Sequence, residues 1–121
     1  MIKCVKLASI PVRDQKKAVA FYTEKLGFEI LTNQAFDEHQ RWIELGLPGA
    51  QTRVVLFTPD AHEDRIGTFQ GLTFQADDVA KTHKELKAKG VEFLHPPKKE
   101  PWGTYTVFKD LDGNQFCLSS N

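Results

Sequence analysis

The side chains with the most versatile chemistry in this sequence are four histidines, His39, His62, His83 and His95, because imidazole binds metals and transfers protons. No two of them have the H-x-x-x-H or H-x-H spacing of paired metal ligands. His83 falls on the solvent edge of a predicted helix, and His62 falls in a polar connecting segment. His39 and His95 border predicted strands and are the two that could meet on a metal ion. For all four, a structural or solvent-exposed role is favoured over metal ligation.

Two further features have the residue types of reactive sites. Cys117 lies in a predicted strand, and its thiol can act as a nucleophile only with a base beside it. No histidine falls near that strand in the sequence, so we interpret Cys117 as a buried, inert thiol. The turn D-L-D-G-N at Asp110–Asn114 resembles a calcium loop but lacks the later ligands and the closing Glu, so we interpret it as structural.

Composition narrows the classes of function. The chain has 121 residues, of which 40% are hydrophobic, and this is enough for one compact domain, residues 1–121. Sixteen basic residues balance sixteen acidic ones, so no net charge favours nucleic acid or an anionic membrane as a partner. We find no leader-like segment and no apolar run long enough to span a membrane. Cys4 and Cys117 are the only cysteines, which is too few for the disulfide framework of a small secreted protein. We therefore expect a cytoplasmic protein.

The chain repeats one pattern. In Ile10–Leu31 and again in Thr73–Leu94, an alternating strand ends at an Asp, a helix follows, and a Gly-led apolar segment starts a new strand. The same interval separates Asp14 from Gly27 and Asp77 from Gly90. Because neither copy can bury its apolar face alone, the pattern predicts two similar modules, residues 1–60 and 68–121.

Each module reads as one helix and four strands. The predicted helices begin at Asp14 and at Asp77 or Asp78, and end at Gly27 and Lys89. A Pro-rich loop, His95–Gly103, interrupts the second module. The predicted strands are Val5–Val12, Phe28–Phe36, Arg41–Leu47, Thr52–Thr58, Gly71–Ala76, Val91–His95, Thr104–Lys109 and Asn114–Ser119.

The order βαβββ–βαβββ, the phrase IPVRDQKKAVAFYTEKLGFEIL and the closing PWGTYTVFKDLDGNQFCL resemble the vicinal oxygen chelate superfamily over essentially the whole chain. This superfamily includes glyoxalase I, extradiol dioxygenases, fosfomycin-resistance enzymes and bleomycin-binding resistance proteins. The resemblance implies an α+β fold in which two βαβββ modules form a curved mixed sheet around a cavity. It also implies a homodimer. It does not select one activity, because the same cavity serves catalysts and binding proteins.

The metal-dependent members of this superfamily place four ligands on strands that face the cavity. Carried over by position, these ligands fall on Leu7, Val55, Gly71 (or Gln70 in an alternative register) and Cys117. Leu, Val and Gly offer no donor atom to a divalent ion, and Cys117 with Gln70 is not a metal site. The resemblance therefore predicts that no metal and no cofactor is bound at the family's usual position.

Strand alternation from these positions predicts which side chains line the cavity. Trp42 and Glu44 share one face of their strand, and Ile43 and Leu45 point to the helix side. The candidate ligand-binding residues, aromatic walls with a few polar groups, are Trp42, Phe57, Trp102, Tyr105, His39, Arg53 and Gln115.

Each of these assignments has an alternative. Trp42 and Phe57 either contact a ligand or fill the cavity and the dimer interface. Arg53 and Glu44 are favoured as a cross-strand ion pair. Trp102 either faces a ligand from the cavity rim or caps the core.

We therefore expect metal-independent binding of a small, partly aromatic organic molecule, with no catalytic residue assigned. The first alternative is a glyoxalase- or dioxygenase-like enzyme, a lyase or an oxidoreductase, with a divalent metal that the sequence does not reveal. The second alternative is a relative that acts mainly through contacts with a partner.

Overall fold

The computed structural model describes residues 1–61 and 63–120, so His62 lies outside the described residues. The chain divides into two compact units, Met1–Ile66 and Gly67–Asn121. This division falls between the predicted modules 1–60 and 68–121. That the two units form a single domain, residues 1–121, stays a prediction.

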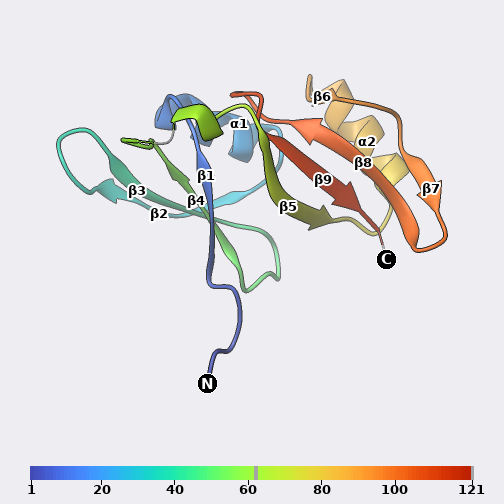
Figure 1. Ribbon diagram of the computed structural model, residues 1–121, viewed down its shortest axis with the longest axis horizontal. Helices are drawn as coiled ribbons and strands as arrows, with labels where there is room; N and C mark the ends of the chain where they lie inside the picture. The colour runs from blue at the N-terminus through green and yellow to red at the C-terminus, as the bar shows by residue number, and fades with distance from the viewer. Residues whose placement is uncertain (62, 121) are drawn as a thin grey trace. The chain divides into compact units, whose positions relative to one another are not determined.

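Unit 1 is a four-stranded mixed sheet with one α-helix (Figure 1). The sheet order is β1-β4-β3-β2, in which β1 is parallel to β4 and the other neighbours are antiparallel. Its elements are β1 (Leu7–Pro11), α1 (Gln15–Glu24), β2 (Glu29–Ala35), β3 (Arg41–Gly46), β4 (Arg53–Phe57) and the short 3₁₀ helix η1 (Glu63–Arg65).

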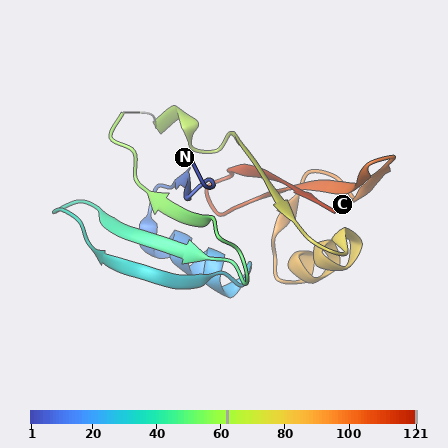
Figure 2. The same ribbon diagram turned by 90° about the horizontal axis from the view of Figure 1, so that it is seen from below.

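Helix α1 begins where the sequence predicts. The side chain of Asp14 accepts a hydrogen bond from the Lys17 amide at 3.1 Å, which satisfies a backbone donor that the first turn leaves open. Gly27 follows the helix with a φ of +77°, a conformation that favours glycine. The helix covers one face of the sheet (Figure 2) and buries Ala18, Phe21 and Tyr22.

The face of the sheet under α1 is the apolar core of unit 1. Ile43 and Leu45 of β3 are at most 1% exposed, and Ile10, Val54 and Leu56 are at most 2% exposed. Burying a large aliphatic or aromatic side chain contributes about 1.5–3 kcal/mol. Strand alternation then turns Trp42, Glu44 and Phe57 to the opposite, open face, as predicted.

Unit 2 repeats the strand–helix–strands order. Its sheet has the order β5-β9-β8-β6, with β5 parallel to β9 and β7 paired to β8. Its elements are β5 (Phe69–Gln75), α2 (Val79–Ala88), β6 (Glu92–Phe93), β7 (Lys98–Glu100), β8 (Gly103–Lys109) and β9 (Gln115–Ser119). Helix α2 lies against this sheet (Figure 2), and its N-cap is Asp78, whose carboxylate accepts from the Lys81 amide.

The segment predicted as the Pro-rich loop His95–Gly103 contains strand β7. Lys98, Lys99 and Glu100 pair with β8, and a tight turn at Pro101 and Trp102 joins the two strands. The loop prediction was wrong here because the prolines flank these three residues and leave their backbone N–H groups available for pairing.

The core of unit 2 is a cluster of aromatic rings. Phe74, Phe93, Phe108 and Phe116 lie in a chain of ring contacts with centroid distances between 5.5 and 6.1 Å. The half-buried His83 ring contacts Phe93 at 4.4 Å, so this residue, predicted at the solvent edge of the helix, also packs against the core. Burial, and secondarily the charge of Lys87, lowers the pKa of His83.

The turn Asp110–Asn114 has the structural role that the sequence indicates. The carboxylate of Asp110 accepts from the backbone amides of Asp112 and Asn114 and from the Asn114 side chain, at 2.9 to 3.0 Å. Asn114 in turn accepts from the Gly67 amide at 2.7 Å. Both side chains are thus committed to closing the turn.

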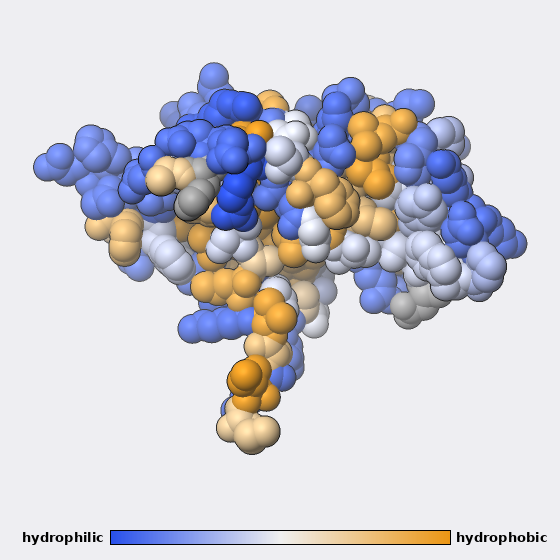
Figure 3. Space-filling model, in the orientation of Figure 1, coloured by the Kyte–Doolittle hydropathy of each residue, from blue (hydrophilic) through white to orange (hydrophobic). Residues whose placement is uncertain are grey.

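The start of the chain forms an apolar projection (Figure 3), and Met1 and Ile2 are exposed. The carbonyl oxygens of Val5 and Lys6 accept hydrogen bonds from Thr52 Oγ1 and from the Arg53 amide. The regular strand β1 begins at Leu7 and not at Val5. Within the described residues, no helix has the length and apolar character needed to cross a membrane.

Candidate functional site

A hollow of about 390 Å³ lies on the open face of unit 1. Its volume is within the range of small-molecule sites. Residues from β1, β3, β4, the β2–β3 loop and η1 line it: Ser9, Phe36, Gln40, Arg41, Trp42, Val55, Phe57 and Arg65. We call this the aromatic hollow, since three of its side chains are aromatic.

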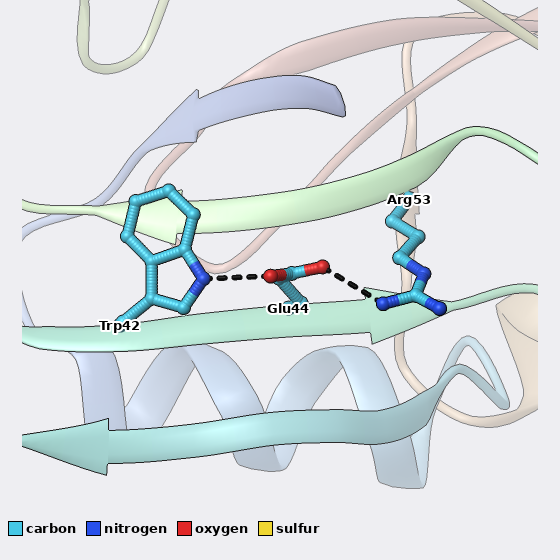
Figure 4. Close-up of polar contacts among 3 residues, drawn as sticks. All are labelled: Trp42, Glu44 and Arg53. Carbon is cyan, nitrogen blue, oxygen red and sulfur yellow. Dashed lines mark hydrogen bonds and ion pairs between the residues drawn. The ribbon is translucent and has the colours of Figure 1, made fainter. Parts of the chain in front are cut away.

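A polar relay holds Trp42 in place (Figure 4). The indole Nε1 of Trp42 donates to Glu44 Oε2 at 2.7 Å, and Arg53 Nη1 donates to Glu44 Oε1 at 3.1 Å. The Trp42 hydrogen bond, and after it that of Arg53, lowers the pKa of Glu44. The carboxylate is therefore charged at neutral pH. The cross-strand ion pair Arg53–Glu44 predicted from the sequence is present, and it also fixes the edge of the Trp42 indole.

Two further contacts shape the aromatic walls. The guanidinium carbon of Arg65 lies 5.8 Å from the centre of the Phe57 ring, within the range of a cation–π contact. The rings of Phe36 and Trp42 are 6.2 Å apart and tilted by 44°. The hollow thus combines flat apolar surfaces with a cationic group.

The β2–β3 loop carries Gln40 into the hollow. One oxygen of Asp37 accepts from the backbone amides of His39 and Gln40, both at 2.8 Å, which closes the loop. The Gln40 side chain accepts from the Thr58 amide just after β4 at 2.7 Å. His39 is exposed in this loop and is not among the residues that line the hollow.

Within unit 1, the structure brings part of the predicted ligand-binding set together. Trp42 and Phe57 line the hollow, and Arg53 joins it through Glu44. The other predicted residues, Trp102, Tyr105 and Gln115, belong to unit 2.

In unit 2, the rings of Trp102 and Tyr105 stack 5.5 Å apart, and His95 contacts Tyr105 edge-on at 5.4 Å. Gln115 and Tyr105 lie on the sheet face opposite the buried Phe116 and Leu118.

The sequence analysis missed four residues of the hollow: Phe36, Gln40, Arg41 and Arg65. For Phe36 a signal existed, since it follows by alternation from Gln34, which pairs with Trp42 across β2 and β3. Gln40 and Arg65 come from a loop and a polar connecting segment, and nothing in their spacing marks them.

The residues at the family's usual metal positions do not fit a divalent ion. Leu7, Val55 and Gly71 have no donor side chain, and Cys117 offers a single free thiol. The Gln70 amide donates to Thr68 and to Asn114 within unit 2. Across the part of the chain that the structure describes, no three His, Cys, Asp or Glu side chains gather closely enough to hold a metal.

Comparisons with known proteins decide the family. A sequence profile of the Glyoxalase/Bleomycin resistance protein/Dioxygenase superfamily matches residues 5–118. This chain belongs to that superfamily. The family resemblance and the α+β fold with two βαβββ-type modules forming mixed sheets are thereby confirmed.

Three known proteins are particularly similar to this chain. The protein YetH of Bacillus subtilis, named as uncharacterized, is 36% identical over 98% of each chain. The crystal structure of a superfamily member from Sphaerobacter thermophilus is 39% identical, covers 99% of this chain and 98% of its own, and has a TM-score of 0.91. The structure of TnmS3, an antibiotic binding protein from a Streptomyces strain, is 37% identical, covers 98% and 96%, and has a TM-score of 0.83.

Proposed function

We propose that this protein binds a small, partly aromatic organic molecule in the aromatic hollow of unit 1, without a metal ion. The observation that carries the proposal is the hollow itself, in which Trp42, Phe57 and Phe36 supply flat apolar surfaces around a few polar groups. Ligand sites generally have this make-up, with apolar contact for affinity and a few polar groups for orientation.

The rigidity of the relay supports a binding role. Trp42 is hydrogen-bonded at its edge to Glu44, and Glu44 is anchored by Arg53, so the indole is ordered before any ligand arrives. A side chain that is already ordered does not lose rotamer freedom on binding, which favours affinity. Three residues on the open face of β3 and β4 thus prepare one aromatic surface.

Two further observations favour binding over the metal-dependent alternative. TnmS3, which this chain matches at 37% identity over nearly its whole length, is an antibiotic binding protein. Three of the four positions that correspond to the family's metal ligands hold Leu7, Val55 and Gly71, which cannot coordinate an ion, and the Cys117 thiol at the fourth is not a metal site alone.

A thermal-shift screen tests the proposal. The purified protein is heated with a panel of planar antibiotics and aromatic metabolites, in EDTA and in parallel with added zinc, nickel or manganese. A ligand at a hundredfold excess over its dissociation constant stabilises the native state by about 2.7 kcal/mol, which raises Tm measurably. We expect at least one aromatic compound to raise Tm equally with and without metal. Stabilisation that appears only when metal is added would refute the proposal.

We also propose that the protein is a homodimer, following the family resemblance. Light scattering at micromolar concentration tests this, and a mass near twice the 13.7 kDa of the chain is expected. A mass of one chain would contradict it.

A further inference from the structure

A second concave region lies on the helix side of unit 1, between α1 and strands β2 and β3. It has a volume of about 290 Å³. Its lining residues are Lys16, Val19, Asn33, Arg41 and Ile43. We call it the α1 groove. Asn33 and Ile43 are register partners and lie on the sheet face under α1, opposite the face that carries Trp42.

The Arg41 guanidinium is held rigidly at the groove. Its Nε donates to Asn33 Oδ1 at 2.6 Å, and its Nη2 donates to the Asn33 backbone oxygen at 3.1 Å. Asn33 is uncharged, so it orients the guanidinium without neutralising it. Among the described residues, the second terminal nitrogen, Nη1, has no hydrogen-bond partner. A fixed guanidinium with a remaining donor is well suited to an oxyanion.

The main chain at Arg41 is fixed as well. The side chain of Gln15, the first residue of α1, accepts from the Arg41 amide and donates to the Arg41 carbonyl, each at 2.9 Å. The same amide nitrogen of Gln15 also donates to the Leu56 carbonyl at 2.9 Å. The helix and two strands are thus tied together beside the groove, so the positions of its walls are set before a ligand binds.

Lys16 adds a second positive charge. Its ammonium has no hydrogen bond or ion pair to the residues that the structure describes. No carboxylate lines the groove within residues 1–61 and 63–120. The nearest acid in sequence, Asp14, is occupied as the helix cap. The first turn of α1, whose amides favour negative charge, contains no acidic side chain.

We propose that the α1 groove is a second binding site, for a compact organic anion: a carboxylate or phosphate group on a short apolar body. Arg41 and Lys16 bind the charged group, and Val19 and Ile43 provide the apolar contact. A volume of about 290 Å³ fits a ligand at the small end of the usual range. Arg41 also lines the aromatic hollow, whereas Lys16, Val19, Asn33 and Ile43 line the α1 groove alone. Binding in the α1 groove is therefore recognised by its effect on Asn33 and Lys16, whether or not the aromatic hollow holds a ligand.

An NMR titration of the ¹⁵N-labelled protein with phenyl phosphate tests the proposal, with benzoate as the carboxylate probe and phenol as the uncharged control. We expect saturable shifts of the Arg41 Nε–H and of the Asn33 side-chain amide with both anions, and no saturation with phenol. The anion with the lower dissociation constant identifies the charged group, phosphate or carboxylate, that the groove prefers. Shifts that remain linear, equal shifts with phenol, or shifts confined to Trp42 and Phe57 would overturn the proposal.

Two variants and one matched control locate the site. Lys16→Glu reverses a charge at the groove, and Lys17→Glu makes the same change on the next residue of α1, which does not line the groove. We expect Lys16→Glu to weaken phenyl phosphate binding by about tenfold, the loss of one charge-assisted hydrogen bond, and Lys17→Glu to change it less than about twofold. An equal loss in both variants would show attraction to general surface charge and refute the site.

Asn33→Asp is the sharper variant. Aspartate has nearly the shape of asparagine and still accepts from Arg41 Nε, so the fold is kept while the guanidinium gains a counter-charge. We expect phenyl phosphate binding to fall by at least about tenfold, with Tm unchanged or raised. Unchanged affinity in this variant would contradict the proposal, whatever the stability of Lys16→Glu.

Discussion

The two units hold their tryptophans in different ways. In unit 1, Trp42 is held at its edge by a hydrogen bond to Glu44 and lies beside a hollow of about 390 Å³. In unit 2, Trp102 lies flat on Tyr105, with 29° between the ring planes, and is 57% exposed. Two copies of one supersecondary pattern therefore present their aromatic side chains differently.

The difference matters because a ring binds flat ligands through its face. A hydrogen bond to the indole N–H contacts only the edge of the ring and covers neither face. Stacking on another ring covers one face, which a ligand then cannot reach. The relay in unit 1 also orders the indole through a charged group, which a stacked pair at an exposed edge does not have. We conclude that the aromatic hollow of unit 1 is the better prepared of the two surfaces.

The largest expected effect comes from removing each tryptophan in turn. Trp42→Ala should weaken binding of the ligand found in the thermal-shift screen by roughly tenfold to hundredfold, because a buried aromatic anchor contributes about 2 kcal/mol or more. Trp102→Ala, the matched control in unit 2, should change affinity by about twofold or less. Isothermal titration calorimetry measures both. Equal losses in the two variants would end the distinction between the units.

A smaller effect is expected from the relay. Glu44→Gln keeps an acceptor for the Trp42 indole but removes the charge that anchors Arg53, so affinity should fall by about threefold. Since the Arg53 side chain is 49% exposed, the loss of unfolding free energy should be only about 0.5 kcal/mol.

Glu92→Gln is the control for the relay. It removes the acid of the Lys109–Glu92 pair of unit 2, which lies at 3.8 Å with the Glu92 side chain 70% exposed. It should change neither affinity nor stability measurably. If Glu44→Gln also leaves affinity unchanged, the relay does not prepare Trp42 for binding.

The smallest expected effects are differences in acid sensitivity between the units. Burial lowers the pKa of His83 from its ordinary value of 6.5. As the pH falls, His83 is therefore protonated in the unfolded chain before it is protonated in the folded chain. The contribution of neutral His83 to stability is therefore present above pH 6.5 and is lost as the pH falls toward the lower folded pKa. Glu44, with its pKa lowered from 4.5, contributes stability above pH 4.5 that is lost below it.

Urea denaturation over a series of pH values separates these two groups. His83→Phe, which keeps a ring against Phe93, should flatten the dependence of unfolding free energy on pH just below 6.5. Glu44→Gln should flatten it only below 4.5. Parallel curves for wild type and both variants would contradict the pKa directions.

The local signals in the sequence were sufficient for most of the fold. Asp14 and Asp78 cap the helices, and alternation along β3 turns Ile43 and Leu45 to the core and Trp42 to the open face. These features depend on neighbouring residues, so local patterns reveal them. Strand β7 was missed because its pairing with β8 depends on the backbone path between the flanking prolines. The Pro-rich composition of the segment does not reveal this path.

The candidate site was less predictable than the fold. Trp42 and Phe57 follow from strand alternation, but Gln40 and Arg65 reach the hollow from a loop and from η1, whose paths are set by tertiary contacts. Arg41 was expected only as the start of a strand. Its hydrogen bonds with Gln15 and Asn33 connect residues far apart in the sequence, and no spacing rule relates them.

The most direct test of the central claim is calorimetry of the strongest aromatic ligand with the protein before and after exhaustive treatment with EDTA. We predict the same dissociation constant in both samples and its loss in Trp42→Ala. A dissociation constant that rises sharply after EDTA and recovers when zinc or manganese is added would contradict metal-independent binding in the aromatic hollow.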